Sequence, residues 1–556
     1  MKLNKLNILR IILSAAAVAS AIWIIWLSLT PIIDRDATRF HLPFAKLWAE
    51  NGFLYFRKWF AYYDLNMLNL NYLYMLVFKF GLPDQLTKVI HASFLLAGGY
   101  LIFRYFKEKY GLNWGLLSFI MYITIPIHQR LASEVYVDLG LLFFSTFSII
   151  YFIKWLESGL DKGKYLFLSA LGTGTAFGTK YNAMIFAFFM TLFVGLVTAR
   201  EKKDDKRAIN NIVIYSALII ACASPWLLRN FINSGNPFFP LFNSVIPSDI
   251  SMPKNLVEGG FGEIMNRIVN GGESIFSLFM LPFRVFFQGA DHDFLKFDGV
   301  LNPFMLLLLP FLYWPKNRLN ADKRKLISYL LIAAAVIYLT TLYVNDIRIR
   351  YFIPVYPIIF ILDIEALKRL GQVRFKFKYS PHILSVLFLL YNLNYSVDYY
   401  RRYNLINYNP FLKSSKQEYL KIYLRNYEII TYINENIPEN SVVYEAFTGG
   451  RSYYINRAVY SDTYPLDRYF IELARNGSPK EAYLDHLKNL PNSDLSATHL
   501  LIRANNFIQT FYEINYDEND PDNVENAKNI SGYIKFIQEM KFLKEKDGIY
   551  LFELIK

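Results

Sequence analysis

Long apolar segments recur along this chain, separated by shorter polar stretches. The first, residues 8–29, reads ILRIILSAAAVASAIWIIWLSL and is about as long as a helix that crosses a bilayer. A cleaved signal peptide is the alternative, because the start is basic and small residues follow. The length of this segment and the segments behind it favour a retained first helix. Eleven segments are predicted to span a membrane: 8–29, 86–103, 112–127, 135–153, 165–179, 182–198, 209–228, 299–314, 326–344, 351–366 and 381–398.

Two further apolar segments, 65–82 and 275–288, fit this pattern less well. We expect them to be helices that lie in the membrane interface or re-enter it. Counting 65–82 as a span would reverse the orientation of every loop that follows. The sequence therefore predicts a polytopic α-helical membrane protein with about 11 transmembrane helices.

The distribution of Lys and Arg tests this arrangement. With a cytoplasmic N-terminus, the inner stretches hold 24 Lys and Arg in 60 residues, and the outer stretches hold 14 in 138 residues. This is the direction of the positive-inside rule. The net charge of +13 is thus mostly a topology signal. No nucleic-acid partner is expected, because no basic patch falls on a soluble part of the chain.

The last part of the chain, residues 400–556, is less apolar than residues 1–399, which form the predicted transmembrane domain. NSVVYEAF, ATHLLIRA and GIYLFELI are typical of short strands, and 421–436 and 465–490 are typical of helices. We expect a small α/β domain, and an odd number of spans places it on the outer face. The one cysteine, Cys222, falls in a predicted span, which excludes disulfides.

The stretch DATRFHLPFAKLWAENG, residues 36–52, follows the first span and carries ionisable side chains. On a helix, Phe40, Phe44 and Trp48 share one face, so this helix is predicted to lie flat on the membrane with its aromatic face in lipid. Asp36 then stands where a helix N-cap is expected. A carboxylate at this level can also act as a general base on an acceptor hydroxyl, and Asp34 is the second candidate.

Other ionisable residues fall at the predicted outer ends of the spans. Each of them alone is explained as a charged side chain that extends to the membrane surface. Only their convergence on one face of the membrane indicates a site. Cations in such a cluster would suit an anionic lipid phosphate. The candidates for phosphate binding are Arg39, Lys180, Arg229, Arg348 and Arg350, and those for substrate binding are His41, His128 and Asp138.

Six stretches together resemble a known family. They are DATRFHLPFAKLWAENG, ASEVYVDLGLLFF, GTGTAFGTKYNAM, PWLLRNFINSGNPFFPLF, RIRYFIPVYP and IPENSVVYEAFTGGRSYYINR. In this order they resemble the GT-C superfamily of integral-membrane glycosyltransferases, in the branch of the protein O-mannosyltransferases and the lipid A aminoarabinose transferases. The resemblance covers most of residues 1–370 and, more loosely, the tail. It implies the GT-C fold.

The resemblance also implies an activity. A glycosyltransferase of this family moves a sugar from a polyprenyl-phosphate donor to an acceptor hydroxyl on the outer face of the membrane, with inversion. Asp36 matches the family's base, and Arg39 matches an arginine that helps to hold the donor phosphate. The family usually has two adjacent acidic residues here, whereas Arg35 separates Asp34 from Asp36 in this chain.

Some relatives bind a divalent cation near the phosphate. Asp34, His41 and His128 are the conceivable ligands, but they lack tight metal-ligand spacing, and the metal stays open. The acceptor can be a lipid, a glycan or a protein. The branch of the family and the absence of a eukaryotic targeting signal favour a bacterial cytoplasmic membrane.

Two other function classes are compatible with the pattern. One is a transporter or flippase of lipid-linked sugars. The sequence argues against it, because it shows no pair of broken helices in two corresponding halves. The other is a polymerase or ligase of lipid-linked glycans, against which the order of the motifs speaks. Release of free polyprenyl phosphate separates a transferase from a transporter.

Overall fold

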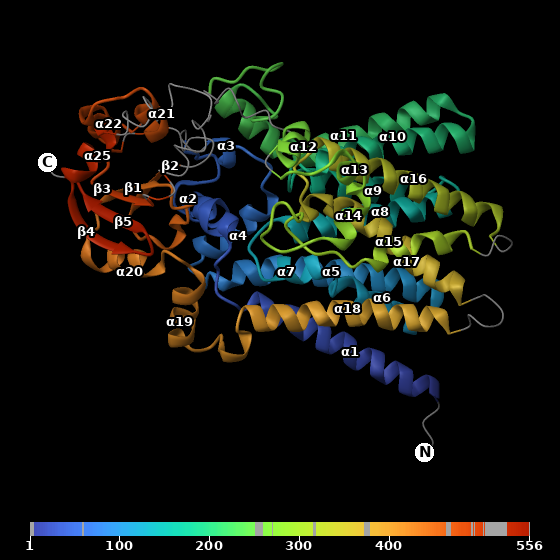
Figure 1. Cartoon of the computed structure of the whole chain (residues 1–556). Helices are drawn as coiled ribbons and strands as arrows, with labels where there is room; N and C mark the ends of the chain where they lie inside the picture. The colour runs from blue at the N-terminus through green and yellow to red at the C-terminus, as the bar shows by residue number, and fades with distance from the viewer. Residues whose placement is uncertain are drawn as a thin grey trace.

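A helical bundle carries a small α/β domain at one end, and α1 begins at the opposite end (Figure 1). The computed structural model describes residues 5–57, 61–250, 260–269, 271–314, 319–371, 379–462, 469–490, 493, 495–503, 505, 507 and 531–554.

The bundle consists of helices of very different lengths. Capping fixes the ends of some of them: the Asp204 side chain accepts from the Arg207 N–H before α11, and Gly235 ends that helix at a positive φ of 74°. The principal helices are α1 (Lys5–Ser28), α5 (Gln85–Tyr110), α6 (Leu112–Ile123), α7 (Pro126–Ala132), α8 (Asp138–Glu157), α9 (Gly163–Phe177), α10 (Ala183–Lys202), α11 (Asp205–Ser234), α16 (Ala321–Val344), α17 (Tyr356–Leu370) and α18 (Ser380–Arg402). The core runs along their packed faces, and α17 is buried over almost its whole length.

Within the described part of the chain, six helices are long and apolar enough to cross a membrane: α1, α5, α8, α10, α11 and α16. The chain is thus a multi-pass membrane protein, while the count of eleven spans and the sidedness stay predictions. The predicted span 299–314 is not one helix. It contains only the short turns α15 (Phe304–Leu307) and η3 (Leu309–Leu312), because Pro303 and Pro310 interrupt regular helical hydrogen bonding.

The segment between α1 and α5 folds into a π-helical turn η1 (Ala37–His41) and the helices α2 (Leu42–Asn51), α3 (Ala61–Asp64) and α4 (Asn69–Lys79). The prediction that the aromatic face of 36–52 lies in lipid is wrong. Phe44 and Trp48 are each only 1% exposed, because protein covers this face. The Trp48 ring lies 5.9 Å from the ring of Trp226 in α11. Amphipathic spacing identifies the apolar side of a helix, but it does not say whether lipid or protein covers that side.

The sequence predicts two large outer loops, 31–85 as the catalytic one and 229–298 as the second. The second continues from the end of α11 into short helices among the residues that are described. These are α12 (Gly260–Val269), α13 (Ile275–Phe279) and α14 (Leu281–Phe287). The predicted helix 275–288 is divided in two, and Pro282 lies in the first turn of its second half.

The α/β domain contains a five-stranded sheet of order β2-β1-β3-β5-β4. Its strands are β1 (Val442–Ala446), β2 (Ala458–Asp462), β3 (His499–Arg503), β4 (Lys541–Lys546) and β5 (Ile549–Glu553). β1 pairs in parallel with β2 and β3, while β5 runs antiparallel to β3 and β4. The three strands expected from the sequence are confirmed, and β2 and β4 were not expected.

Helices cover both faces of this sheet. On one face, Ile429 and Ile433 of α20 (Tyr427–Asn436) belong to the same core cluster as Val443 and Leu551. On the other face lie α21 (Tyr469–Arg475), α22 (Lys480–Lys488) and α25 (Ser531–Gln538) (Figure 1). The predicted helix 421–436 is broken: α19 (Lys413–Tyr423) ends before α20 begins. The first four residues of the predicted helix 465–490 lie outside the described residues.

The α/β domain and its connector contact the segment directly after α1. The Tyr408 hydroxyl donates to the Leu29 carbonyl at 3.0 Å, and the Tyr454 hydroxyl donates to the Ile32 carbonyl at 2.9 Å. Arg451 reaches the Ile33 carbonyl at 3.4 Å. The chain just before Asp34 and Asp36 is therefore held by residues more than 370 positions later.

Candidate active site at the end of the bundle

Asp34 and Asp36 lie where the chain leaves α1 and enters η1, and their side chains have different partners. Asp34 Oδ2 accepts from the Val135 N–H at 2.8 Å, and Asp36 Oδ2 accepts from Arg350 Nη1 at 2.7 Å. Asp36 has helical backbone angles and its side chain makes no capping hydrogen bond, so the N-cap interpretation is wrong. The π-helical turn is of a kind that often occurs at functional sites.

The ion pair between Asp36 and Arg350 joins the first loop to η4 (Ile349–Val355). The Asp36 side chain is 21% exposed and that of Arg350 is 8% exposed. Burial alone would raise the pKa of Asp36, but the guanidinium of Arg350 outweighs this effect and holds the pKa well below its usual range. Asp36 is thus ionised at neutral pH. Arg350 Nε is buried and makes no hydrogen bond to the described residues.

Three cations converge on the ring of Tyr351. Lys180 Nζ lies 5.0 Å from the ring centroid, and the guanidinium carbons of Arg350 and Arg348 lie 5.4 and 5.7 Å from it. Lys180 also donates to Asp138 Oδ1 at 2.8 Å, at the first residue of α8. The predicted convergence of these charges is therefore observed for residues from four separate parts of the chain: Asp36, Asp138, Lys180, Arg348 and Arg350.

His41 borders the same group of charges. Its Nδ1 lies 3.0 Å from Asn71 Oδ1, and Asn71 Nδ2 donates back to the His41 carbonyl at 3.0 Å. The second bond fixes the amide, so Nδ1 carries the proton and Nε2 is left as an acceptor. Burial lowers the pKa of His41 to about 4, although the Asp36 carboxylate opposes this, and His41 is neutral at pH 7.

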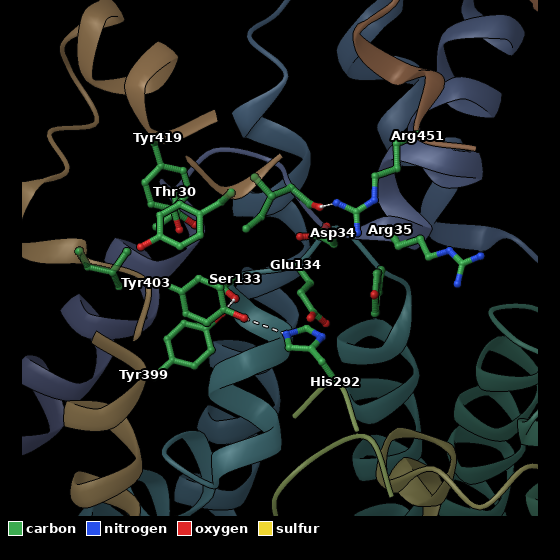
Figure 2. A pocket seen from close by; sticks show the side chains of 14 residues that line it. Thr30, Asp34, Arg35, Ser133, Glu134, His292, Tyr399, Tyr403, Tyr419 and Arg451 are labelled. Carbon is green, nitrogen blue, oxygen red and sulfur yellow. Dashed lines mark hydrogen bonds between the residues drawn. The ribbon is translucent and has the colours of Figure 1, made fainter. Parts of the chain in front are cut away.

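Asp34 faces a cavity of about 250 Å³ (Figure 2). Burial raises the pKa of Asp34, although the ammonium of Lys88 nearby opposes this. Glu134 and Tyr136 also line the cavity, and Arg451 reaches it from the α/β domain. Tyr136 joins the two halves of the site, because the guanidinium of Arg350 lies 4.9 Å from its ring.

Three predicted residues lie apart from this cluster in their contacts. Arg229 is fully buried and its guanidinium binds Asp64 at 2.8 Å. His128 is fully buried too, and its Nδ1 lies 2.8 Å from the Tyr122 carbonyl. Arg39 is 7% exposed, with its guanidinium carbon 5.1 Å from the Tyr63 ring centroid.

The residues do not form a metal centre. Within the described parts of the chain, no group of three or more His, Cys, Asp and Glu side chains could hold a metal ion. Asp34 faces the cavity, while His41 binds Asn71 and His128 binds the backbone of α6. These three residues therefore do not form a set of ligands that fits a divalent cation.

The sequence analysis missed several residues of the site. Lys88 is fully buried in α5 and donates to the carbonyls of Thr30 and Pro31 at 2.9 and 3.0 Å. A charged residue in the first turn of an apolar segment could have signalled it. Tyr136 and Tyr351 stood within the quoted motifs, but aromatic residues are so common in this chain that nothing set them apart.

Comparisons with solved structures identify proteins of similar fold. Two crystal structures of ArnT from Cupriavidus metallidurans, one in the apo state and one bound to undecaprenyl phosphate, are similar at a TM-score of 0.54 and 12% identity. The match covers 98% of this chain and 97% of theirs. The oligosaccharyltransferase AglB from Archaeoglobus fulgidus is similar at a TM-score of 0.49 and 11% identity, over 88% of this chain and 69% of that one.

No curated protein matches the sequence. The ArnT structures confirm the expected GT-C fold. Residues 72–357, which contain most of the site, match the model of a family described as "Domain of unknown function (DUF8201)". The match covers more than half of the sequence, and the chain belongs to this family.

Proposed function

We propose that this protein is a glycosyltransferase that moves a sugar from a polyprenyl-phosphate donor to an acceptor hydroxyl on the outer face of a bacterial cytoplasmic membrane. One observation carries the proposal: Lys180, Arg348 and Arg350 surround Tyr351 beside the ionised Asp36. Such a cluster offers an anionic phosphate three cations within reach of a carboxylate base. Undecaprenyl phosphate in the ArnT structure supports this class of donor.

The roles follow from the contacts. The acceptor oxygen attacks the anomeric carbon, the bond from that carbon to the phosphate oxygen breaks, and the configuration inverts. Asp36 takes the hydroxyl proton, and the polyprenyl phosphate leaves with its charge stabilised by Arg350 and Lys180. The buried Nε of Arg350, which has no partner among the described residues, is a donor available to a phosphate oxygen.

Donor binding would also activate the base. In the unliganded protein Arg350 lowers the pKa of Asp36, which makes Asp36 a weak base. A phosphate that shares the Arg350 charge weakens this effect, so the pKa of Asp36 rises once the donor is bound. The base then gains strength only when there is a sugar to transfer.

The direct test supplies radiolabelled polyprenyl-phosphate sugars and membrane extract to the purified protein. We expect label in a new product with wild type and none with Asp36→Asn. Asn keeps an oxygen that can accept from Arg350, so the variant is expected to fold. It cannot take the hydroxyl proton, so it should be inactive. Asp161→Asn is the control, since Asp161 pairs with Lys202 near the start of α9, at the far end of α8 from Asp138.

Equal transfer by wild type and Asp36→Asn would refute Asp36 as the base, and Asp34→Asn would then be compared. A flippase would move label across a vesicle without releasing polyprenyl phosphate. A polymerase or ligase would transfer preassembled glycans but not single sugars.

A further inference from the structure

The cavity beside Asp34 lies between parts of the chain that are distant in sequence. The loop after α1, the turn between α7 and α8, the end of α18, and α19 all contribute to it, and the α/β domain supplies Arg451 (Figure 2). Its volume of about 250 Å³ is just below the roughly 300–1,000 Å³ of pockets that enclose drug-sized ligands. It suits a group about the size of one monosaccharide.

Tyrosine rings in contact with one another form one wall of this cavity. The ring centroids of Tyr399 and Tyr403 are 4.5 Å apart, those of Tyr403 and Tyr423 are 5.7 Å apart, and those of Tyr419 and Tyr423 are 4.5 Å apart. We call these four residues the tyrosine wall. Tyrosine combines a rigid apolar face with a polar tip, which fits a ligand with apolar C–H faces and hydroxyl edges.

Two carboxyl groups provide hydrogen-bond partners for such hydroxyls, and burial raises the pKa of one of them, Glu134, to about 8. Glu134 is 5% exposed, and its Oε1 accepts from Arg130 Nε at 3.0 Å. Its Oε2 is buried without a hydrogen-bond partner among the residues that are described. Figure 2 shows the Glu134 carboxylate between Asp34 and His292 in the middle of the cavity. A buried carboxylate oxygen without a partner is costly, and a ligand hydroxyl would satisfy it.

The charge of the lining indicates a neutral ligand. Asp34 and Glu134 carry the acidic groups, and Arg35 and Arg451 carry the guanidinium groups, so the formal charges balance. A strongly anionic or cationic ligand would find no excess of opposite formal charge in this lining.

The cavity also adjoins the proposed transfer centre. Asp34 and Tyr136 lie in its wall, and Tyr136 contacts Arg350, which pairs with Asp36. The cavity and the cation cluster thus share Tyr136 as a neighbour, and Asp34 in the cavity wall is two residues from Asp36. For transfer, one hydroxyl of a sugar bound in this cavity would have to extend to the Asp36 carboxylate.

We propose that this cavity is the acceptor subsite and that the acceptor is a neutral sugar residue of a glycan, held between the tyrosine wall and the carboxyl groups of Asp34 and Glu134. The role of this sugar as an acceptor rests on the proposed function. The binding of a neutral sugar in the cavity can be tested without any donor.

The first experiment measures binding by saturation-transfer NMR on the full-length protein in nanodiscs. The probes are maltotetraose, cellotetraose, chitotetraose and mannotetraose. Saturation transfer from the protein to the ring protons of at least one probe is expected with wild type and with Tyr403→Phe, which keeps the aromatic ring. Tyr403→Ala should weaken it by about tenfold in Kd. Tyr379→Ala is the control, because this exposed tyrosine precedes the other end of α18.

Tyr423→Ala is the second variant, in case Tyr403→Ala does not fold, because Tyr423 is only half-buried. The inference would be overturned if no probe showed saturation transfer, or if both alanine variants bound the probes as tightly as wild type. So would turnover with a peptide or a lipid as the only effective acceptor.

The second experiment separates this inference from the proposed function. Release of free polyprenyl phosphate from the labelled donor is measured with and without the sugar that binds. Tyr403→Ala should raise the KM for the acceptor about tenfold and leave the KM for the donor unchanged. If wild type bound the sugar but released no polyprenyl phosphate, the proposed transferase activity would be refuted, and with it the role of the bound sugar as an acceptor. Release with an unchanged acceptor KM would refute the subsite alone.

Discussion

Arg229 offers a test that separates a structural from a functional arginine. Its guanidinium donates to Asp64 Oδ1 at 2.8 Å and to the carbonyls of Asp64, Tyr55 and Phe53 at 2.7, 3.0 and 3.2 Å. Both side chains of the ion pair are 0% exposed. The guanidinium carbon also lies 5.0 Å from the Trp48 ring centroid. These contacts fix the loop that covers α2, so we expect Arg229 to stabilise the fold rather than to bind the donor.

The magnitude follows from burial. Arg229→Met keeps the length of the side chain but removes the guanidinium that pairs with the buried Asp64 carboxylate. Breaking a buried pair in this way costs about 3–5 kcal/mol in the free energy of unfolding. Asp64→Asn should cost a similar amount, because it leaves the guanidinium unpaired. The double variant should lose less than the sum, with a coupling energy of about 2–3 kcal/mol.

Denaturant unfolding in detergent measures these values for the two single variants and the double variant. Arg284→Met is the control, because Arg284 pairs with Glu273 at 2.8 Å but is 19% exposed, and a smaller loss is expected. The KM for the labelled donor is measured on the same samples. If Arg229→Met unfolded like wild type while the donor KM rose, the reasoning would be refuted and Arg229 would be a phosphate ligand.

Three further predictions concern other parts of the molecule. Arg350→Gln should lower kcat by about 10²–10³ through loss of charge stabilisation, and transfer of label checks this; a change in donor KM alone would contradict it. Gly172→Ala should lower the melting temperature, since its Cβ would lie 2.8 Å from the Ser148 backbone nitrogen, whereas Gly163→Ala has open space and should not. His41 should make stability depend on pH. A histidine titrates near 6.5 when unfolded, and burial lowers the folded pKa of His41 to about 4. Stability is therefore full above pH 6.5 and falls by about 3 kcal/mol as the pH drops to 4. Unfolding from pH 7 to 4 should be less pH-dependent in His41→Asn, and equal slopes would contradict this.

The sequence was enough to predict which charged residues lie together, but not how the helices around them are covered. Asp36, Asp138, Lys180 and Arg350 were expected together because each falls at the end of an apolar segment, and ends on one side of a bundle meet. The cover over Phe44 and Trp48 could not be predicted, since lipid and protein impose the same apolar pattern. The break in 299–314 could have been expected from Pro303 and Pro310.

The tyrosine wall illustrates what the sequence could not show. Tyr399 and Tyr403 are four residues apart, as are Tyr419 and Tyr423, so each pair is visible as a helical repeat. Contact between the pairs depends on how α19 turns back against the end of α18, and no local pattern encodes that. A helix cap was one of the two interpretations of Asp36, but its side chain instead pairs with Arg350, 314 positions later in the chain.

The bond from Tyr454 to the Ile32 carbonyl spans 422 positions, and this has a consequence for biosynthesis. At about 5–20 residues per second, a ribosome makes Tyr454 roughly 20–80 seconds after Ile32. During that interval the segment before Asp34 and Asp36 lacks the contacts that hold it. A nascent or prematurely terminated chain can therefore insert its helices in the bilayer while the segment before Asp34 and Asp36 is not yet held in place. The segment that carries Asp34 and Asp36 gains these contacts only after the last part of the chain has been made and has folded onto the first.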